Sequence, residues 1–311
     1  MIIISCITDL EGAKKCWEKI SYNERITDNW DFRYFFYKYQ NFALYFYTVE
    51  LSEKPGEIVG LLPLQLDPVH GLEFFAEEVS NYNRPFVKPG FEYVIPDLYK
   101  IIDQKAQLFY IAGADDFTKN LPICEYEYSL DLKILKSFDD FLMTNLISKR
   151  RRNLSKELLN IEKLNLESNI KNNQEEGWSE YMRILFKFNI NTHKEESYLN
   201  SLDEQKYYFE LLKLPYQWRL AVVEIDKEIQ AISLSALYNN IWYYLLTGVN
   251  FKVYPGLGKY LQKINIEQAI NEKAESFNAG QGDCNWKKLW HLDELPLYEF
   301  EYGFDTPKVE N

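Results

Sequence analysis

Hydrophobic residues in the first 130 positions fall into short runs with strand-like composition. FALYFYTVE, residues 42–50, is aromatic and β-branched, SEKPGE supplies turn residues, and IVGLLPLQL follows at 58–66. This order predicts a β-hairpin. GLEFFAEEV and QLFYIAG indicate two further strands, with a helix from about Pro96 to Gln104. The stretch therefore predicts a mixed α/β unit.

The spacing becomes helical after residue 136. Ser137, with Asp140 three positions later, is typical of a capped helix start, and apolar residues from Phe138 to Ile161 then recur at helical spacing. This pattern predicts one long amphipathic helix over 137–161. EGWSEYMRILFKFNI and DEQKYYFELLKL predict two more helices, the second ending before Pro215.

Three apolar segments joined by short polar turns begin at Trp218. WRLAVVEI, IQAISLSALY and IWYYLLTGVN predict a three-stranded meander. PGLGKYLQKINIEQAI then predicts a glycine loop that opens a helix, and ESFNAG predicts another strand. The first half of the chain repeats a weaker version of this order.

The length of the chain, 311 residues, exceeds the size at which one hydrophobic core usually stops growing. We therefore expect the α/β (α+β) class with two tandem lobes, residues 1–130 and 131–311. Each lobe should be a mixed, mostly antiparallel sheet flanked by helices.

Charge and cysteine content narrow the range of partners. A net charge of −12 repels nucleic-acid phosphate unless positive charge is concentrated locally. The four cysteines form no CxxC pair and there are three histidines, so neither a disulfide framework nor a metal site is indicated. No stretch approaches the ~20 apolar residues that span a bilayer, and the N-terminal apolar run is too short for a signal peptide. We expect a cytoplasmic protein without a metal and without a DNA partner.

The glycine loop is the first candidate binding site. A strand ending near Asn250, then Gly256, Leu257 and Gly258 and then a helix, leaves backbone N–H groups free at the positive end of the helix. Glycine allows a phosphate to approach such a backbone closely. The same residues also suit a plain strand-to-helix turn, and spacing alone leaves both interpretations open.

The order of these motifs resembles a known family. A hairpin, a long strand, x-x-G-x-G, a helix and a strand are similar to the acyl-CoA-binding half of the GNAT acetyltransferase superfamily. SKRRRNLSKELLNIEKL, YPGLGKYL and FNAGQGDCNWKKLW, in this order over residues 130–290, resemble the two-lobed CelD-like acetyltransferases of polysaccharide biosynthesis and their Fem-type aminoacyltransferase relatives. The resemblance implies two GNAT-like lobes.

The resemblance also implies a co-substrate, acetyl-CoA or another acyl-CoA, with its pyrophosphate on the amides of the glycine loop. Its acceptor would be an amino sugar or another small amine. The family's usual Gln or Arg at the first motif position is Val253 here, and Pro255 removes a donor. The coenzyme-binding residues implied are Val249, Tyr254, Gly256, Leu257, Gly258 and Lys259.

Acyl transfer to an amine needs a neutral nucleophile, a stabilised oxyanion and a proton for the leaving thiolate. Asp283 is a candidate base, although an Asp here would equally cap the next helix. Lys287 could grip an acidic acceptor or steady the oxyanion, as the resemblance to Fem-type enzymes suggests, or could be a solvated surface lysine. Trp286 stands where the family commonly has Tyr and would meet the acceptor.

Two tyrosines on the central strand offer the proton for the thiolate. The side chains of Tyr243 and Tyr244 lie on opposite faces, so only one can face the cleft. Tyr244 is the candidate acid, and Tyr254 beside the glycine loop is another.

A basic run, Lys149–Arg152, fans around most of a helix at ~100° per residue. Arg151 and Arg152 are candidates for holding a phosphate or sugar acid of the acceptor. A solvated helix with Glu157 and Glu162 nearby is the alternative.

The leading hypothesis is an acyl-CoA-dependent N-acyltransferase of surface polysaccharide assembly. A Fem-like enzyme using aminoacyl-tRNA is a second, which the net charge disfavours. A catalytically degenerate GNAT fold that acts as a binding module is a third, kept open by Val253, Pro255 and Trp286. The oligomeric state is left open.

Overall fold

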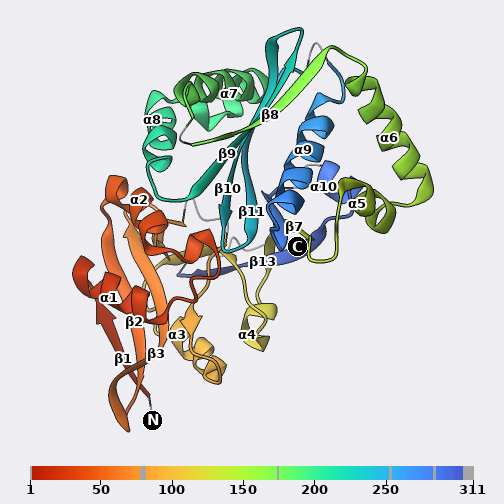
Figure 1. The fold of residues 1–311 in the computed structure, drawn as a ribbon. Coiled ribbons are helices and arrows are strands. Elements are labelled where there is room, and N and C mark those ends of the chain that lie inside the picture. The colour runs from red at the N-terminus through yellow and green to blue at the C-terminus, as the bar shows by residue number, and fades with distance from the viewer. Residues whose placement is uncertain (1, 78–81, 174, 252–253, 283–284, 304–311) are drawn as a thin grey trace, which may run out of the picture. The chain divides into compact units, whose positions relative to one another are not determined.

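The computed structural model describes residues 2–77, 82–173, 175–251, 254–282 and 285–303 (Figure 1). The chain divides into two compact units. The first unit comprises Met1–Glu127 and Leu295–Asn311, and the second comprises Tyr128–Glu294. The lobes expected at 1–130 and 131–311 stay a prediction.

The first unit is a mixed sheet with helices. Its strands follow the order β1-β2-β3-β4-β6-β13, in which β4 and β6 are parallel and the other neighbouring strands are antiparallel. Their bounds are β1 Ile2–Ile7, β2 Ala43–Leu51, β3 Lys54–Asp67, β4 Gly71–Phe74, β6 Ala106–Ile111 and β13 Asp293–Tyr302, with β5 Phe86–Val87 beside β3. The helices are α1 Leu10–Ile20, α2 Trp30–Gln40, α3 Ile95–Lys100 and α4 Asp116–Lys119.

The predicted hairpin of the first unit is confirmed. Strands β2 and β3 pair from Ala43 and Leu66 at one end to Leu51 and Lys54 at the other. Alternation along these strands sends side chains to two separate cores. Leu62 and Leu64 join one core, whereas Leu61 packs in the other with Trp17 and Trp30.

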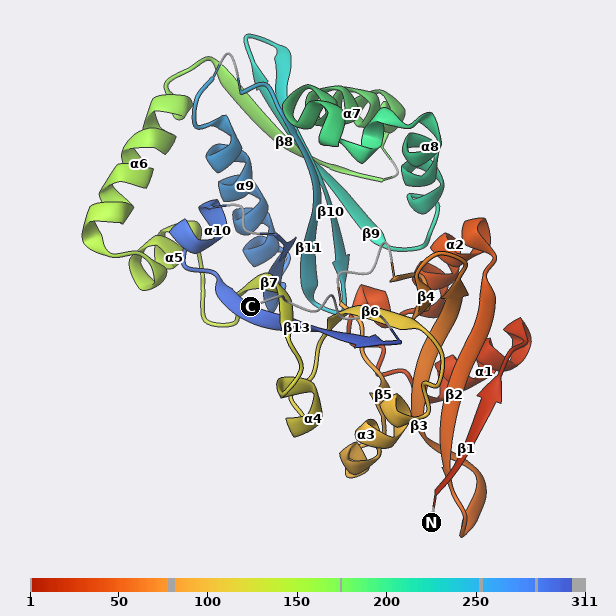
Figure 2. The same ribbon diagram turned by 180° about the vertical axis from the view of Figure 1, so that it is seen from behind.

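The second unit has a sheet in the order β7-β12-β11-β10-β9-β8 (Figure 2). The strands are β7 Ile123–Asp131, β8 Leu166–Asn172, β9 Gln217–Ile225, β10 Glu228–Tyr238, β11 Ile241–Val249 and β12 Ser276–Gln281. The helices are α5 Phe138–Asn145, α6 Ser148–Glu162, α7 Trp178–His193, α8 Leu202–Leu211, α9 Leu257–Asn271 and α10 Trp286–Leu289. Short 3-10 turns are η1 Ile26–Asp28 and η3 Glu92–Val94 in the first unit, and η4 Lys194–Glu196 and η5 Tyr198–Asn200 in the second.

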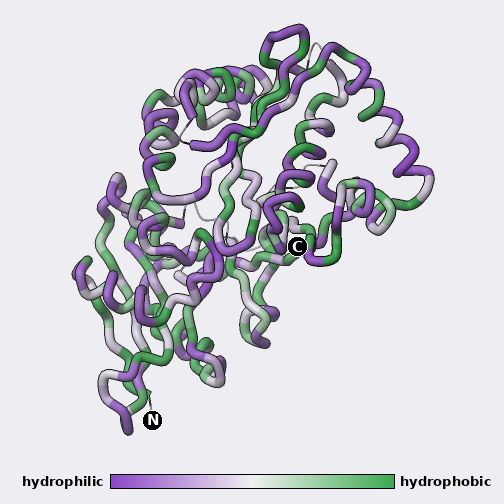
Figure 3. The backbone as a smooth tube through the Cα atoms, in the orientation of Figure 1, coloured by the Kyte–Doolittle hydropathy of each residue, from purple (hydrophilic) through white to green (hydrophobic). Residues whose placement is uncertain are grey.

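The meander β9–β11, helix α9 and strand β12 are confirmed, and the apolar character of these strands is visible in Figure 3. The single long helix over 137–161 is wrong. Ser137 does cap its start, since its Oγ accepts from the Asp140 N–H at 3.1 Å. The backbone then becomes extended at Leu146 and Ile147, with ψ of 132° and 150°, which ends α5 and separates it from α6.

Helix α9 is fixed on the sheet by a buried polar contact. Asn265 Nδ2 donates to Ser233 Oγ at 2.8 Å, and Ser235 Oγ donates to Asn265 Oδ1 at 2.9 Å. All three residues are fully enclosed. Because buried polar groups are costly without partners, this trio selects one docking position for α9 and so sets where its N-terminus lies.

Candidate active site

Strands β11 and β12 are parallel neighbours over only part of their length. The register pairs Ile241 with Ser276, Trp242 with Phe277 and Tyr243 with Asn278, and extends no further among the described residues. Beyond Tyr243 the pairing of β11 with β10 shifts, so that Leu245 is an extra residue in the strand. A bulge of this kind bends a strand and increases its twist. An extended ligand with amide groups could hydrogen-bond to backbone exposed in this way.

The glycine loop leads from β11 into α9. Gly256 is the N-cap of α9 in the left-handed region, with φ of 91°, and no side chain caps the helix. The amides of Lys259 and Tyr260 bond to the Gly256 carbonyl at 3.0 and 3.2 Å. This conformation favours glycine, and the uncapped positive helix end favours an anion.

Gly258 is needed for space rather than for a positive φ. A Cβ at this position would lie 3.1 Å from Cε1 of Phe251, whose side chain is 52% exposed. At Gly256 the nearest atom to such a Cβ is Ile161 Cγ1, at 3.9 Å. The two glycines therefore have different physical roles in the loop.

The other candidate coenzyme residues lie around the same helix end. Val249 and Leu257 are buried, so they offer backbone groups rather than side chains. Tyr254 is half-buried. The ammonium of Lys259 forms an ion pair with Glu157 of α6, so a phosphate would compete for it. Val253 lies outside the described residues.

Lys287 is buried in α10, with only 3% of its surface exposed. Its Nζ donates to the carbonyl oxygens of Gly280, at 3.0 Å, and Gln281. It also lies 5.0 Å from the centre of the Tyr128 ring. These contacts connect α10 to the end of β12. The candidate base Asp283 lies outside the described residues.

Tyr244 and Trp286 are brought together by the fold. Their rings meet edge to face with centres 6.3 Å apart, and the Tyr244 ring is 5.7 Å from that of Phe277. Trp286 in turn contacts Trp290, at 5.9 Å. Burial raises the pKa of the Tyr244 hydroxyl, so Tyr244 stays protonated.

The arginines of α6 separate according to their angle around the helix. Arg150 Nη1 donates to Nε2 of His291, just after α10, at 2.9 Å. Arg151 is half-buried and Arg152 is exposed. Among the residues that the structure describes, neither has an ion pair. Sequence reasoning therefore missed Arg150, the member of the run that reaches the region of α10.

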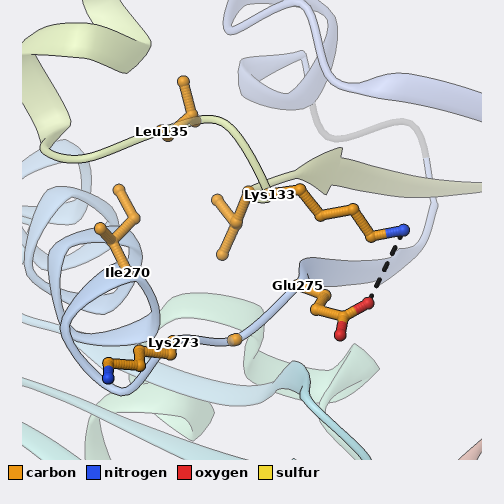
Figure 4. Close-up of a pocket in the computed structure, with 7 residues that line it drawn as sticks. Lys133, Leu135, Ile270, Lys273 and Glu275 are labelled. Atoms are coloured by element: carbon orange, nitrogen blue, oxygen red, sulfur yellow. Dashed lines mark ion pairs between the residues drawn. The ribbon is translucent and has the colours of Figure 1, made fainter.

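A shallow pocket of about 440 Å³ lies at the other end of α9 (Figure 4). Leu135, Ile270 and Lys273 contribute to it, and Lys133 pairs with Glu275 across it at 3.6 Å. Over 15 residues, α9 spans about 22 Å. Because the glycine loop is at the opposite helix end, this pocket is distinct from the candidate phosphate site.

The first unit contains a buried polar network that sequence reasoning missed. Arg33 donates to the carbonyl oxygens of Thr27, Phe75 and Tyr82 at 2.7–3.1 Å. Burial lowers its pKa to about 10. Burial likewise raises the pKa of Glu77 to about 8. These charges, far apart in the sequence, come together only through folding.

Two features are absent from the described parts of the chain. No group of three or more His, Cys, Asp or Glu residues there could hold a metal ion. None of the helices described is long and apolar enough to cross a membrane.

Comparison with known proteins identifies the class of the fold. Residues 148–288 match the family described as acetyltransferase (GNAT) domain. A tandem GNAT protein from the clavulanic acid biosynthesis pathway is similar in structure, with a TM-score of 0.52, 11% identity and coverage of 98% of this chain and all of that one. The protein therefore has a two-lobed GNAT fold, as predicted.

Two further solved structures resemble the chain. L-PGS from Bacillus licheniformis has a TM-score of 0.57 and 13% identity, covering 94% of this chain and 91% of that one. FemX has a TM-score of 0.55 and 11% identity, covering 96% and 97%. At such identities the likeness shows the fold alone. No curated protein matches the chain.

Proposed function

We propose that this protein is an acyl-CoA-dependent N-acyltransferase that acylates an amino sugar or another small amine in surface polysaccharide biosynthesis, as in the CelD-like enzymes it resembles. The observation that carries the proposal is the bulged strand β11, partly paired with the parallel β12, leading into the uncapped helix end at Gly256. An acyl-CoA is an extended chain with amide groups and a pyrophosphate. The bulged strand β11 suits the amide groups, and the uncapped helix end at Gly256 suits the pyrophosphate.

The coenzyme would lie with its pyrophosphate on the amides after Gly256 and its pantetheine along β11 beyond Tyr243. Val249, Tyr254, Leu257 and Gly258 would line this path, mainly through backbone groups. Lys259 would exchange its bond with Glu157 for a phosphate oxygen. We place the reaction in the cytoplasm, where acyl-CoA is available.

The transfer step forms a C–N bond and breaks the C–S thioester bond. The neutral amine attacks the thioester carbonyl, and its excess proton passes to Asp283 directly or through water. The thiolate that leaves takes a proton from Tyr244, which burial keeps protonated, and Tyr244 then regains a proton from solvent as Asp283 releases its own. A raised pKa makes Tyr244 a weak acid, so its hydrogen bond would stabilise the thiolate as that charge develops.

The acceptor would lie against Trp286, opposite the thioester. Trp286 offers an aromatic face for a sugar ring, and its contact with Tyr244 would bring the acceptor near the proton donor. Arg151 and Arg152 would hold an acidic group of the acceptor. We propose Lys287 as a positioning residue, because its ammonium is already engaged by two carbonyl groups.

The Fem-like alternative, with aminoacyl-tRNA as donor, shares this fold, since FemX is a structural neighbour. It predicts that transfer depends on a charged tRNA and that acyl-CoA doesn't bind. The binding-module alternative predicts tight coenzyme binding without turnover on any amine.

Native mass spectrometry with added acetyl-CoA tests the proposal. We expect one coenzyme per chain. In the second unit a left-handed glycine, Gly256, caps α9, whereas the corresponding position before α3 of the first unit is Val94, in the right-handed helical region. Gly256→Val should abolish the adduct, and the matched variant Gly56→Val, also at a positive φ but near the start of strand β3 in the first unit, should keep it. Release of free thiol with a panel of amino sugars then tests turnover. Absence of a coenzyme adduct in the folded parent protein would contradict the proposal.

A further inference from the structure

Helix α6 presents a basic outer face. At about 100° per residue, Lys149, Arg152, Lys156 and Lys163 project within roughly 60° of one another, with Leu159 beside them. All five are exposed. We call this set the α6 outer face. Figures 1 and 2 show α9 lying between α6 and the sheet, so this face is turned away from the core of the second unit.

The remaining sides of α6 are already occupied. Leu154, Leu158 and Ile161 are buried. Glu157 and Glu162 form ion pairs with Lys259 and Lys263 of α9, the second at 2.6 Å. The acidic residues of this helix are thus committed to its inner contact. Within the described part of the chain, none of the four cations of the outer face has an ion pair.

The position of the charges is unfavourable for the isolated helix. Lys149, Arg150 and Arg151 fall in the first turn of α6, where the helix dipole disfavours cations, and no acidic residue is present in that turn. Solvated helix faces usually mix charges of both signs. In a chain with a net charge of −12, this local excess of positive charge would be stabilised by an anionic partner.

Exposed apolar side chains accompany the cations. Leu159 lies within the outer face with 55% of its surface exposed. Ile147, the residue before α6, is 66% exposed, and Met143 of α5 is 65% exposed. Nucleic-acid phosphates bind cations but gain nothing from such side chains. An anionic bilayer binds both, because apolar groups enter the headgroup region while cations contact the lipid phosphates.

We propose that the α6 outer face is a peripheral docking surface for an anionic lipid bilayer. The cations would contact lipid phosphates, and Leu159 would enter the interface. Arg152 is the one residue that this surface shares with the proposed acyl-transfer site, where it would hold the acceptor. The other members of the α6 outer face lie outside that site, and the lysine variants that test the surface leave Arg152 unchanged.

Vesicle flotation tests the proposal with the full chain. Vesicles of phosphatidylcholine with about 30% phosphatidylglycerol should bind the parent, and pure phosphatidylcholine vesicles should not. The triple variant Lys149→Gln/Lys156→Gln/Lys163→Gln should reduce binding at least ~10-fold, and added salt should act in the same direction. Leu159→Gln should reduce binding several-fold without altering the charge.

A matched control separates the surface from net charge. Lys187→Gln/Lys194→Gln/Lys227→Gln removes three exposed lysines of the second unit that lie outside α6, and should leave vesicle binding within about twofold of the parent. Equal losses in both triple variants would overturn the proposal, as would failure of the parent to bind anionic vesicles. The proposal would also be overturned if Leu159→Gln bound vesicles as well as the parent does and a short RNA duplex displaced the vesicles. That result would favour a nucleic-acid-binding surface. Circular dichroism checks that each variant is folded.

Discussion

The ammonium of Lys287 lies 3.0 Å from the carbonyl oxygen of Gly280 and holds the end of β12 to α10. A lysine so deeply buried and donating to backbone carbonyls is a structural contact first. Through its contacts with Gly280 and Gln281, Lys287 holds the end of β12 against α10, which begins at Trp286.

Lys287→Met should therefore destabilise the protein as well as slow the transfer reaction. Met keeps most of the volume but removes the donor to Gly280 and Gln281, so we expect the free energy of unfolding to fall by about 1–3 kcal/mol. The kcat for transfer should fall with coenzyme Kd unchanged. Urea unfolding and steady-state kinetics measure both, and the exposed neighbour Lys288→Met is the control. Unchanged stability with only a raised acceptor KM would instead support an acceptor-gripping lysine.

Gly258→Ala should weaken coenzyme binding about 10-fold or more without destabilising the helix, because Ala is the better helix former but its methyl obstructs the phosphate. Calorimetry with acetyl-CoA gives the affinity. The alternative cause is a clash with Phe251, 3.1 Å from the new Cβ. In the double variant with Phe251→Ala that clash is removed. Recovery of the parent affinity would mean that Gly258 serves only to clear the Phe251 ring.

Tyr244→Phe should lower kcat by ~10²-fold, within the range for loss of general acid help, while its ring contacts with Phe277 and Trp286 remain. Since burial raises the pKa of Tyr244, the parent should show no loss of rate from its ionisation up to pH ~10. Rate profiles against pH test this. Tyr243→Phe, on the opposite face of β11, is the matched control and should keep kcat. Equal losses in both variants would point to a general effect on β11.

Glu77 should make stability depend on pH. Burial raises its pKa to about 8, so the folded protein keeps this proton over a range, from about 4.5 to 8, in which the unfolded chain releases it. Stability from this group is therefore present below pH 4.5 and declines as pH rises towards 8, by at most about 1.4 kcal/mol per unit. Urea unfolding across this range should show a shallower decline for Glu77→Gln than for the parent. The exposed Glu53→Gln should follow the parent, and parallel curves for Glu77→Gln and the parent would contradict the assignment.

The candidate site could be predicted in part from local sequence. The meander, the glycine loop and α9 follow from strand alternation, turn residues and helical spacing, which act over a few neighbours. The roles of individual side chains could not be predicted from local sequence. Lys287 looks like a surface lysine in the sequence, and its burial depends on Gly280 and Tyr128, the latter 159 positions away in the numbering.

Sequence alone determined the β2–β3 hairpin, the β9–β11 meander and helix α9, because pattern and turn chemistry are local properties. The tertiary structure decided what local pattern can't encode. The break at Leu146 and Ile147 divides a continuous apolar pattern, and Leu146 is buried there. The polar strand β8 is a strand because its backbone pairs with β9, and part of β13 pairs with β6, nearly two hundred residues earlier. Backbone pairing and burial of charge depend on which distant segments meet, and that is a property of the whole fold.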